Sequence, residues 1–181
     1  SEQWWKVGDI MSEIRVDTIK NRAGTSTITT ADVTNTPAFL VKLSADTNIT
    51  DATETKVEFD TEIIDTDNKY DNSTNYRFTP GVAGTYFLFA QVYIKSNANA
   101  ELADMRVTIK RNTTRIFTTR HNPATNDANS ITLNVSTIDV ANDTDYYEVH
   151  VFANDESGNP TIEASENGVT SFFGGYKLIG L

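Results

Sequence analysis

The sequence predicts an all-β protein in which a β-sandwich follows an N-terminal arm. Short segments with alternating apolar and polar residues recur along the chain, separated by turns rich in Asn and Asp. Thr, which favours strands, and Asn, which favours turns, are both abundant. No segment has the sustained i, i+3, i+4, i+7 apolar spacing of a capped helix. Many short strands at this spacing are typical of a sandwich or jelly roll.

Residues 1–36 are predicted to form the arm. Ile14, Val16 and Ile19 alternate loosely, and residues 22–36 are rich in Thr, Ala and Gly with few large apolar side chains. Such a segment buries little apolar area by itself. We therefore expect it to stay extended or to fold against a partner.

The alternation sharpens from Pro37, so residues 37–181 are predicted to form the sandwich domain. Phe39, Val41 and Leu43 are expected to share one face of a strand. Val57, Phe59 and Thr61 are expected to do the same in the next strand. Further strands are predicted at 105–110, 115–120, 131–138, 146–153, 161–164 and 170–178.

The segment 84–95 is apolar on both faces. One face has Tyr86, Leu88, Val92 and Ile94, and the other has Phe87, Phe89 and Tyr93. In an antiparallel protein, such a strand needs a second surface to bury its outer face. His150 and Phe152 share a strand face and are expected to reach the same surface. The sequence leaves open whether another copy or a loop of the same chain covers these aromatic side chains.

Composition excludes several classes of function. The chain has no cysteine, which excludes disulfides, zinc fingers, iron–sulfur sites and a thiol nucleophile. Its net charge of −10 argues against nucleic-acid binding, and the basic residues between Lys110 and Arg120 are interpreted as a solvated strand face. No stretch approaches the roughly 18 apolar residues of a membrane helix. Residues 1–10 have no apolar core or cleavage signal, so no secretory signal peptide is expected.

Catalysis is not expected either. His121 and His150 are the only histidines, and neither lies in a catalytic motif. No Gly-x-Ser-x-Gly elbow, His-Glu-x-x-His pair or glycine-rich phosphate loop occurs. Most acidic residues fall in turns, where Asp is a turn former, whereas a glycosidase needs two carboxylates facing one cleft.

One acidic turn is a candidate for calcium, and no other cofactor is expected. Asp65, Asp67 and Asp71 place carboxylate oxygens at close spacing, and oxygen is the ligand that Ca²⁺ prefers. The segment lacks the glycine and the terminal glutamate of an EF-hand loop. The alternative is a cluster of Asx turns.

Several motifs occur in an order that resembles a known family. They include Pro37-Ala-Phe39, Gly84-Thr-Tyr-Phe-Leu-Phe89 and Thr170-Ser-Phe-Phe-Gly-Gly-Tyr-Lys-Leu178. Residues 37–181 are similar to the C1q/tumour-necrosis-factor (TNF) jelly-roll superfamily, and more closely to its C1q-like branch. The chain departs from the family at residues 142–149, where Asn and Asp replace a Gly-Asp turn, and it has no collagen-like repeat upstream. The resemblance implies a ten-stranded jelly roll that assembles as a trimer. The predicted interface residues are Phe87, Phe89, Tyr93, His150 and Phe152.

The arm has a resemblance of its own. The segment Met11-Ser-Glu-Ile-Arg-Val-Asp-Thr-Ile-Lys20, followed by Ala-Gly-Thr25, is similar to the N-terminal segment of tail-fibre and other structural proteins of tailed phages. This resemblance implies that the arm plugs the protein into the particle. Large rigid side chains make good anchors in a socket. The predicted anchor residues are Trp4, Trp5, Ile14, Val16 and Ile19. The alternative is that residues 1–10 are disordered or not native.

Together these observations predict a virion structural protein of a tailed bacteriophage. The expected form is a trimeric fibre, knob or decoration protein on the virion surface, which exposes its jelly roll for adhesion to a host-surface glycan. Residues 65–75, 121–129 and 154–160 are the candidate recognition loops. One alternative is a secreted C1q-like adhesin or lectin. Another is a carbohydrate-active enzyme on a jelly-roll frame.

Overall fold

The computed structural model describes residues 18–20, 27–29, 35–97, 102–123, 128–156 and 158–179. By its internal contacts the chain divides into two units, Ser1–Thr34 and Asn35–Leu181. In the first unit, β1 (Thr18–Lys20) and β2 (Thr27–Thr29) form an antiparallel pair with Ile19 opposite Ile28. The function of this unit as an arm stays a prediction. The predicted anchors Trp4, Trp5, Ile14 and Val16 lie outside the described residues, as does the side chain of Ile19.

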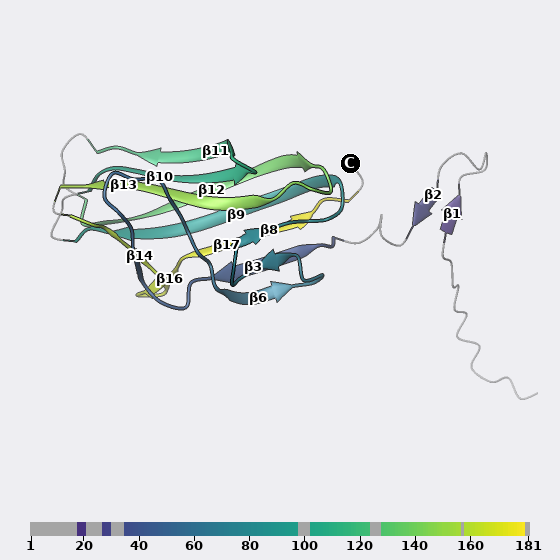
Figure 1. Ribbon diagram of the computed structural model, residues 1–181, viewed down its shortest axis with the longest axis horizontal. Coiled ribbons are helices and arrows are strands. Elements are labelled where there is room, and N and C mark those ends of the chain that lie inside the picture. The colour runs from purple at the N-terminus through teal and green to yellow at the C-terminus, as the bar shows by residue number, and fades with distance from the viewer. Residues whose placement is uncertain are drawn as a thin grey trace, which may run out of the picture. The chain divides into compact units, whose positions relative to one another are not determined.

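The second unit is a sandwich of two antiparallel sheets (Figure 1). The β9 sheet has the order β4-β14-β9-β17-β3-β6, with β12 also paired to β9, and the β10 sheet has the order β11-β10-β13-β8-β7, with β5 paired to β13. The strands of the β9 sheet are β3 (Ala38–Lys42), β4 (Thr47–Asn48), β6 (Thr61–Asp65), β9 (Gly84–Lys95), β12 (Ser130–Ala141), β14 (Thr161–Glu163) and β17 (Phe172–Lys177). Those of the β10 sheet are β5 (Thr55–Lys56), β7 (Tyr70–Asp71), β8 (Arg77–Phe78), β10 (Leu102–Arg111), β11 (Thr114–His121) and β13 (Tyr147–Asp155).

The remaining described strands, β15 (Ser165–Glu166) and β16 (Val169–Thr170), form a small hairpin of their own. The described part of the chain is all-β, as predicted, and has no helix long and apolar enough to cross a membrane. The two sheets hold more strands than the ten that the resemblance implies, because pairings of only two residues, such as β4 and β7, count as strands.

The alternating patterns identify the core correctly. Phe39, Val41 and Leu43 are buried, as expected from their shared face. Val57 and Phe59 are also buried, although strand β6 begins only at Thr61. The Val57 backbone N–H donates to the Val149 carbonyl at 2.9 Å, so this segment is held against β13 without forming a continuous ladder.

Strand β9 is the centre of its sheet. On one edge it pairs with β12 over its whole length, from Gly84 opposite Ala141 to Lys95 opposite Ser130. On the other edge it pairs first with β17 and then with β14. Since both edges are occupied, β9 cannot accept another strand, and a partner can reach it only through its outward side chains.

An aromatic core joins the two sheets. Phe39 of β3 stacks on Phe78 of β8 with ring centroids 4.1 Å apart, and it meets Phe173 of β17 edge-on at 4.8 Å. Phe78 also meets Tyr86 of β9 edge-on at 5.9 Å. Such ring pairs add about 0.5–1.5 kcal/mol each beyond the area they bury. These contacts fix how the sheets face each other.

Two adjacent glycines let β17 pack closely on both faces. A Cβ at Gly175, on the core side, would lie 2.7 Å from Leu88 Cδ2 and 2.8 Å from the Phe87 carbonyl oxygen. A Cβ at Gly174, on the outward side, would lie 2.7 Å from the Phe89 ring. The ring of Phe89 therefore lies across the backbone of Gly174, where no side chain holds it away.

The close approach at Gly175 predicts that Gly175→Ala destabilises the domain. The added methyl meets backbone and core atoms that cannot move away easily, so we expect a loss of about 1–3 kcal/mol in the free energy of unfolding. Urea denaturation measures this change. Gly84→Ala is the control, because its Cβ would meet only the flexible side chain of Lys177. Equal effects of the two substitutions would contradict this explanation.

Candidate functional site: an apolar sheet face

The outward face of the β9 sheet carries a connected group of aromatic rings. Phe87 lies 5.7 Å from Phe89 and 5.6 Å from Tyr176, between ring centroids. Phe89 in turn lies 6.1 Å from Phe172. Each ring is only partly buried. Phe87 and Phe89 thus point away from the core as predicted, and β17 supplies a further ring partner for each of them.

Neighbouring strands extend these rings into a wider apolar surface, because residues opposite each other in an antiparallel pair share a face. Ile138 of β12 lies opposite Phe87 and is 61% exposed. Leu40 of β3 lies opposite Gly174, and Ile64 of β6 lies opposite Leu40. We call this surface the apolar face. Its residues are Leu40, Ile63, Ile64, Phe87, Phe89, Ile138, Val140, Phe172 and Tyr176.

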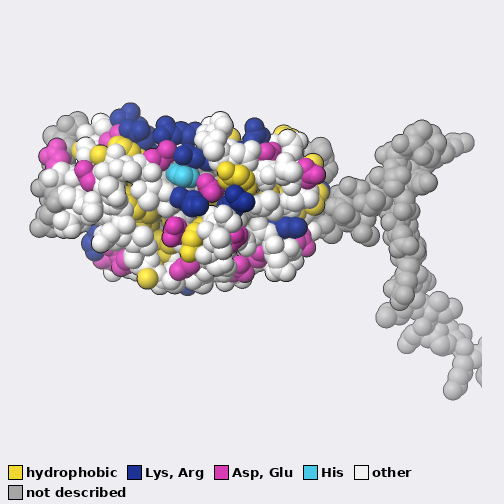
Figure 2. Space-filling view, in the orientation of Figure 1, with side chains coloured by type: hydrophobic (Ala, Val, Ile, Leu, Met, Phe, Trp, Pro, Cys, Tyr) yellow, Lys and Arg dark blue, Asp and Glu magenta, His cyan; other side chains and the backbone are white. Residues whose placement is uncertain are grey.

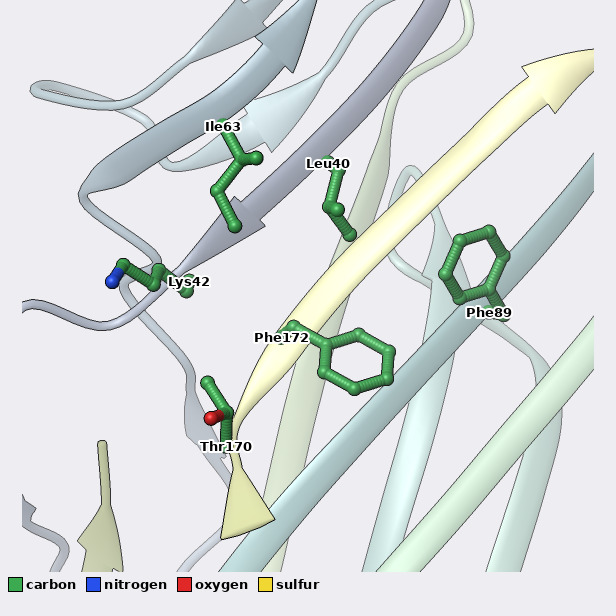
Figure 3. A pocket seen from close by; sticks show the side chains of 6 residues that line it. All are labelled: Leu40, Lys42, Ile63, Phe89, Thr170 and Phe172. Carbon is green, nitrogen blue, oxygen red and sulfur yellow. The ribbon is translucent and has the colours of Figure 1, made fainter. Parts of the chain in front are cut away.

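The apolar face is hollowed on one side. Figure 3 shows the side chains around a groove of about 430 Å³ between β3, β6, β9 and β17. Its lining is mostly hydrocarbon, with an ammonium and a hydroxyl group at one border. Apolar depressions of this kind receive protruding side chains at protein interfaces. The lining residues are Leu40, Lys42, Ile63, Phe89, Thr170 and Phe172.

Tyr93 ends the apolar face rather than extending it. Its hydroxyl donates to Glu166 Oε2 at 3.0 Å, and Lys95 Nζ lies 3.0 Å from the other oxygen of the same carboxylate. The hydrogen bonds from Lys95 and Tyr93 hold the pKa of Glu166 below its ordinary value. The β15–β16 hairpin of the same chain therefore provides the partner of Tyr93, in line with the alternative that a loop covers part of this face.

His150 and Phe152 lie elsewhere, which corrects the expectation of one surface for all five residues. Both belong to β13 in the β10 sheet, where His150 lies opposite Thr108 and Phe152 lies opposite Arg106. Their side chains point outward on the other side of the sandwich. The alternation in the sequence shows which side chains point away from the core, but it does not show to which sheet a strand belongs.

Sequence reasoning missed Leu40, Ile138, Phe172 and Tyr176. The period-2 pattern does place Phe172 and Tyr176 on one face of their strand, and that signal was available. Their position beside Phe87 depends on the register between β17 and β9, which joins segments about 80 residues apart.

Two of the three predicted calcium ligands, Asp65 and Asp71, accept backbone hydrogen bonds. Asp65 accepts hydrogen bonds from the backbone N–H groups of Lys69 and Tyr70, at 3.0 and 2.9 Å. Asp71 accepts backbone hydrogen bonds in the following turn, that from Thr74 being 2.9 Å long, and these bonds lower its pKa to about 2. No group of three His, Cys, Asp or Glu side chains within the described ranges is placed to hold a metal ion. The Asx-turn alternative accounts for this segment.

We therefore expect Asp71→Ala to lower the free energy of unfolding by about 1 kcal/mol, through the lost cap of the turn. Thermal unfolding in millimolar Ca²⁺ and in a chelator measures the loss of stability on substitution and shows whether that loss depends on Ca²⁺. The loss is expected to be the same in both solutions. Asp67→Ala, which removes an exposed carboxylate, is the control. A Ca²⁺-dependent rise in Tm that Asp71→Ala abolishes would restore the calcium site.

Comparison with known proteins identifies the fold. No family model and no curated protein matches the sequence. Among solved structures, the globular domain of zebrafish complement 1qA matches with a TM-score of 0.57 at 13% identity, over 80% of this chain and 99% of that chain. Murine APRIL matches with a TM-score of 0.57 at 14% identity, over 78% of this chain and 98% of that chain. Eiger TNF from S. frugiperda matches with a TM-score of 0.54 at 10% identity, over 80% of this chain and 93% of that chain. The sandwich therefore has the jelly-roll fold of C1q and TNF domains.

Proposed function

We propose that the chain is a non-enzymatic, homotrimeric structural protein of a tailed-phage virion. It attaches through its N-terminal unit as a fibre, knob or decoration protein, and it exposes the jelly roll on the virion surface for adhesion to a host-surface glycan. The observation that carries the proposal is the apolar face, which the single chain leaves partly exposed.

The apolar face favours association with other copies. Fully burying one large apolar side chain is worth about 1.5–3 kcal/mol, and contiguous exposed apolar surface marks interaction sites. Phe117, on the edge strand β11, is 50% exposed and is a further apolar side chain outside the nine residues of the apolar face. Contact between two different surfaces of identical copies is heterologous, and it closes into a ring when the rotation permits. A ring of three is the assembly that the family resemblance implies.

The virion assignment is supported by residues 11–25, which resemble phage structural proteins. Residues 1–34 also form a unit separate from the jelly roll, which suits an attachment segment. The experiments below separate assembly from attachment.

The assembly proposal predicts that Phe89→Asp gives a monomer. A carboxylate at the centre of a buried interface would be desolvated without a partner, which costs several kcal/mol. Light scattering of the full chain is expected to give three times the 20.0 kDa mass for wild type and one chain mass for the variant. Phe152→Asp, an equal change on the outward face of the β10 sheet, is the control and is expected to stay trimeric. The same mass for both variants would contradict the assignment of the interface.

The attachment proposal predicts that deletion of residues 1–34 preserves the trimer but prevents incorporation into particles. The double substitution Trp4→Ala and Trp5→Ala is expected to act in the same direction, through loss of rigid contact area. The amount of protein in purified particles, relative to a capsid protein, measures incorporation. A truncated chain that enters particles at the wild-type level would rule out the N-terminal unit as the anchor.

A further inference from the structure

The outward face of the β10 sheet is cationic in a chain whose net charge is −10. Figure 2 shows Lys and Arg side chains gathered over β10 and β11, with a histidine among them. The register places these residues on one face, because they lie opposite one another or in alternate positions along the same strands. We call this surface the cationic face. Its basic residues are Lys56, Arg106, Lys110, Arg115 and Arg120.

The cations form two like-charged pairs across neighbouring strands. Arg106 of β10 lies opposite Arg120 of β11, and Lys110 lies opposite Arg115. Like charges directly opposite each other are destabilising. Each pair therefore needs a negative charge beside it to offset the repulsion.

One carboxylate bridges each pair. Asp104 accepts hydrogen bonds from Arg106 and from Arg120, the latter with Nε at 2.7 Å. Burial alone would raise the pKa of Asp104, but these two guanidinium groups outweigh it and hold the pKa below its ordinary value. Glu54 bridges the second pair, with Lys110 Nζ at 3.0 Å and Arg115 Nε at 3.1 Å.

The bridges leave the face positive. With Glu148, which lies 3.4 Å from Lys56, three carboxylates face five cations, so the net charge of the cationic face is +2. The side chains of Arg115 and Arg120 are 56% exposed, so their guanidinium groups are accessible to a ligand. Guanidinium groups bind carboxylate, sulfate and phosphate oxygens strongly.

Neutral polar groups lie between the two cation pairs, and of the two threonines there Thr118 is exposed whereas Thr108 is buried. The hydroxyls of Thr108 and Thr118 lie 2.9 Å apart, and His150 lies opposite Thr108 on β13. Burial lowers the pKa of His150, although its partner Glu148 Oε2, at 3.1 Å, opposes this effect. Hydroxyl and imidazole groups hydrogen-bond sugar hydroxyls as donors and acceptors.

The spacing of the pairs favours a polymer over a small ion. Arg106 and Lys110 are four residues apart along β10, which corresponds to about 13 Å. A single small anion reaches only one pair, whereas a chain with repeated anionic groups reaches both. Nucleic acid fits less well, because domains that bind its backbone are usually basic overall.

We propose that the cationic face binds an anionic polysaccharide, with Arg120 and Arg115 contacting successive anionic groups and the exposed Thr118 contacting the sugar between them. The inference rests on the proposed adhesive function and names its surface and ligand class. It places recognition on a strand face rather than in the loops expected from the sequence. The apolar face belongs to the other sheet, so the two faces share no residue.

Binding of the full-length protein to immobilised dextran sulfate, polygalacturonate and glycosylated teichoic acid tests the proposal. These probes present sulfate, carboxylate and phosphate, and neutral dextran is the blank. Wild type is expected to bind at least one of them at low salt, with affinity that falls as salt rises. The double variant Arg115→Gln, Arg120→Gln is expected to lose at least about tenfold in affinity, because two charge contacts are lost. Lys69→Gln with Lys177→Gln, an equal charge change elsewhere, is the control and is expected to keep wild-type affinity.

Absence of wild-type binding to all three probes would overturn the proposal. An equal loss in the control pair would also overturn it, and so would tighter binding to duplex DNA than to any polysaccharide. Native mass and particle incorporation are measured on the same variants and are expected to stay at wild-type values. If Arg-dependent binding occurs in a protein that neither trimerises nor enters particles, the virion function fails while the ligand site stands.

Discussion

The structure depends on strand β9, which is paired on both edges and apolar on both faces. Its inward side chains, Tyr86, Leu88, Val92 and Ile94, are buried completely, and Tyr86 meets Phe78 of the opposite sheet edge-on. Its outward side chains Phe87 and Phe89 meet each other and the rings of Tyr176 and Phe172 on β17, and both stay partly exposed. Because no edge of β9 is free, packing over the outward face is the only way to remove those rings from water. The same strand therefore organises the core and supplies the surface for a partner.

The two outward faces of the sandwich have opposite chemistry. One side carries the apolar face on β6, β3, β17, β9 and β12. The other carries the cations of β11, β10 and β5 together with the carboxylates that pair with them. Such a sandwich suits a protein that covers its apolar face by self-association and presents its cationic face to a ligand. The two proposed contacts therefore use different outward faces of the same sandwich.

Local patterns and the family resemblance together predicted the fold, but local patterns identified only two residues of the apolar face. Alternation identified Phe39, Val41 and Val57 as core, and the two-faced pattern of residues 84–95 identified Phe87 and Phe89 as outward. The placement of His150 failed because a period of two does not assign a strand to a sheet. The ion pairs of the cationic face were also missed. Glu54 meets Lys110 and Arg115 only through pairings between distant segments, so the sequence from Lys110 to Arg120 was interpreted as an ordinary solvated strand.

The central claim is that other copies cover the apolar face, and thiol reactivity tests it most directly because the chain has no cysteine. Ile138→Cys places a single thiol on the apolar face, and Thr118→Cys places one on the cationic face, both at positions that are exposed in the single chain. The account predicts that the Ile138→Cys thiol reacts with a polar maleimide at least about tenfold more slowly than the Thr118→Cys thiol, because burial at an interface excludes the reagent. Equal rates in the folded protein would contradict it.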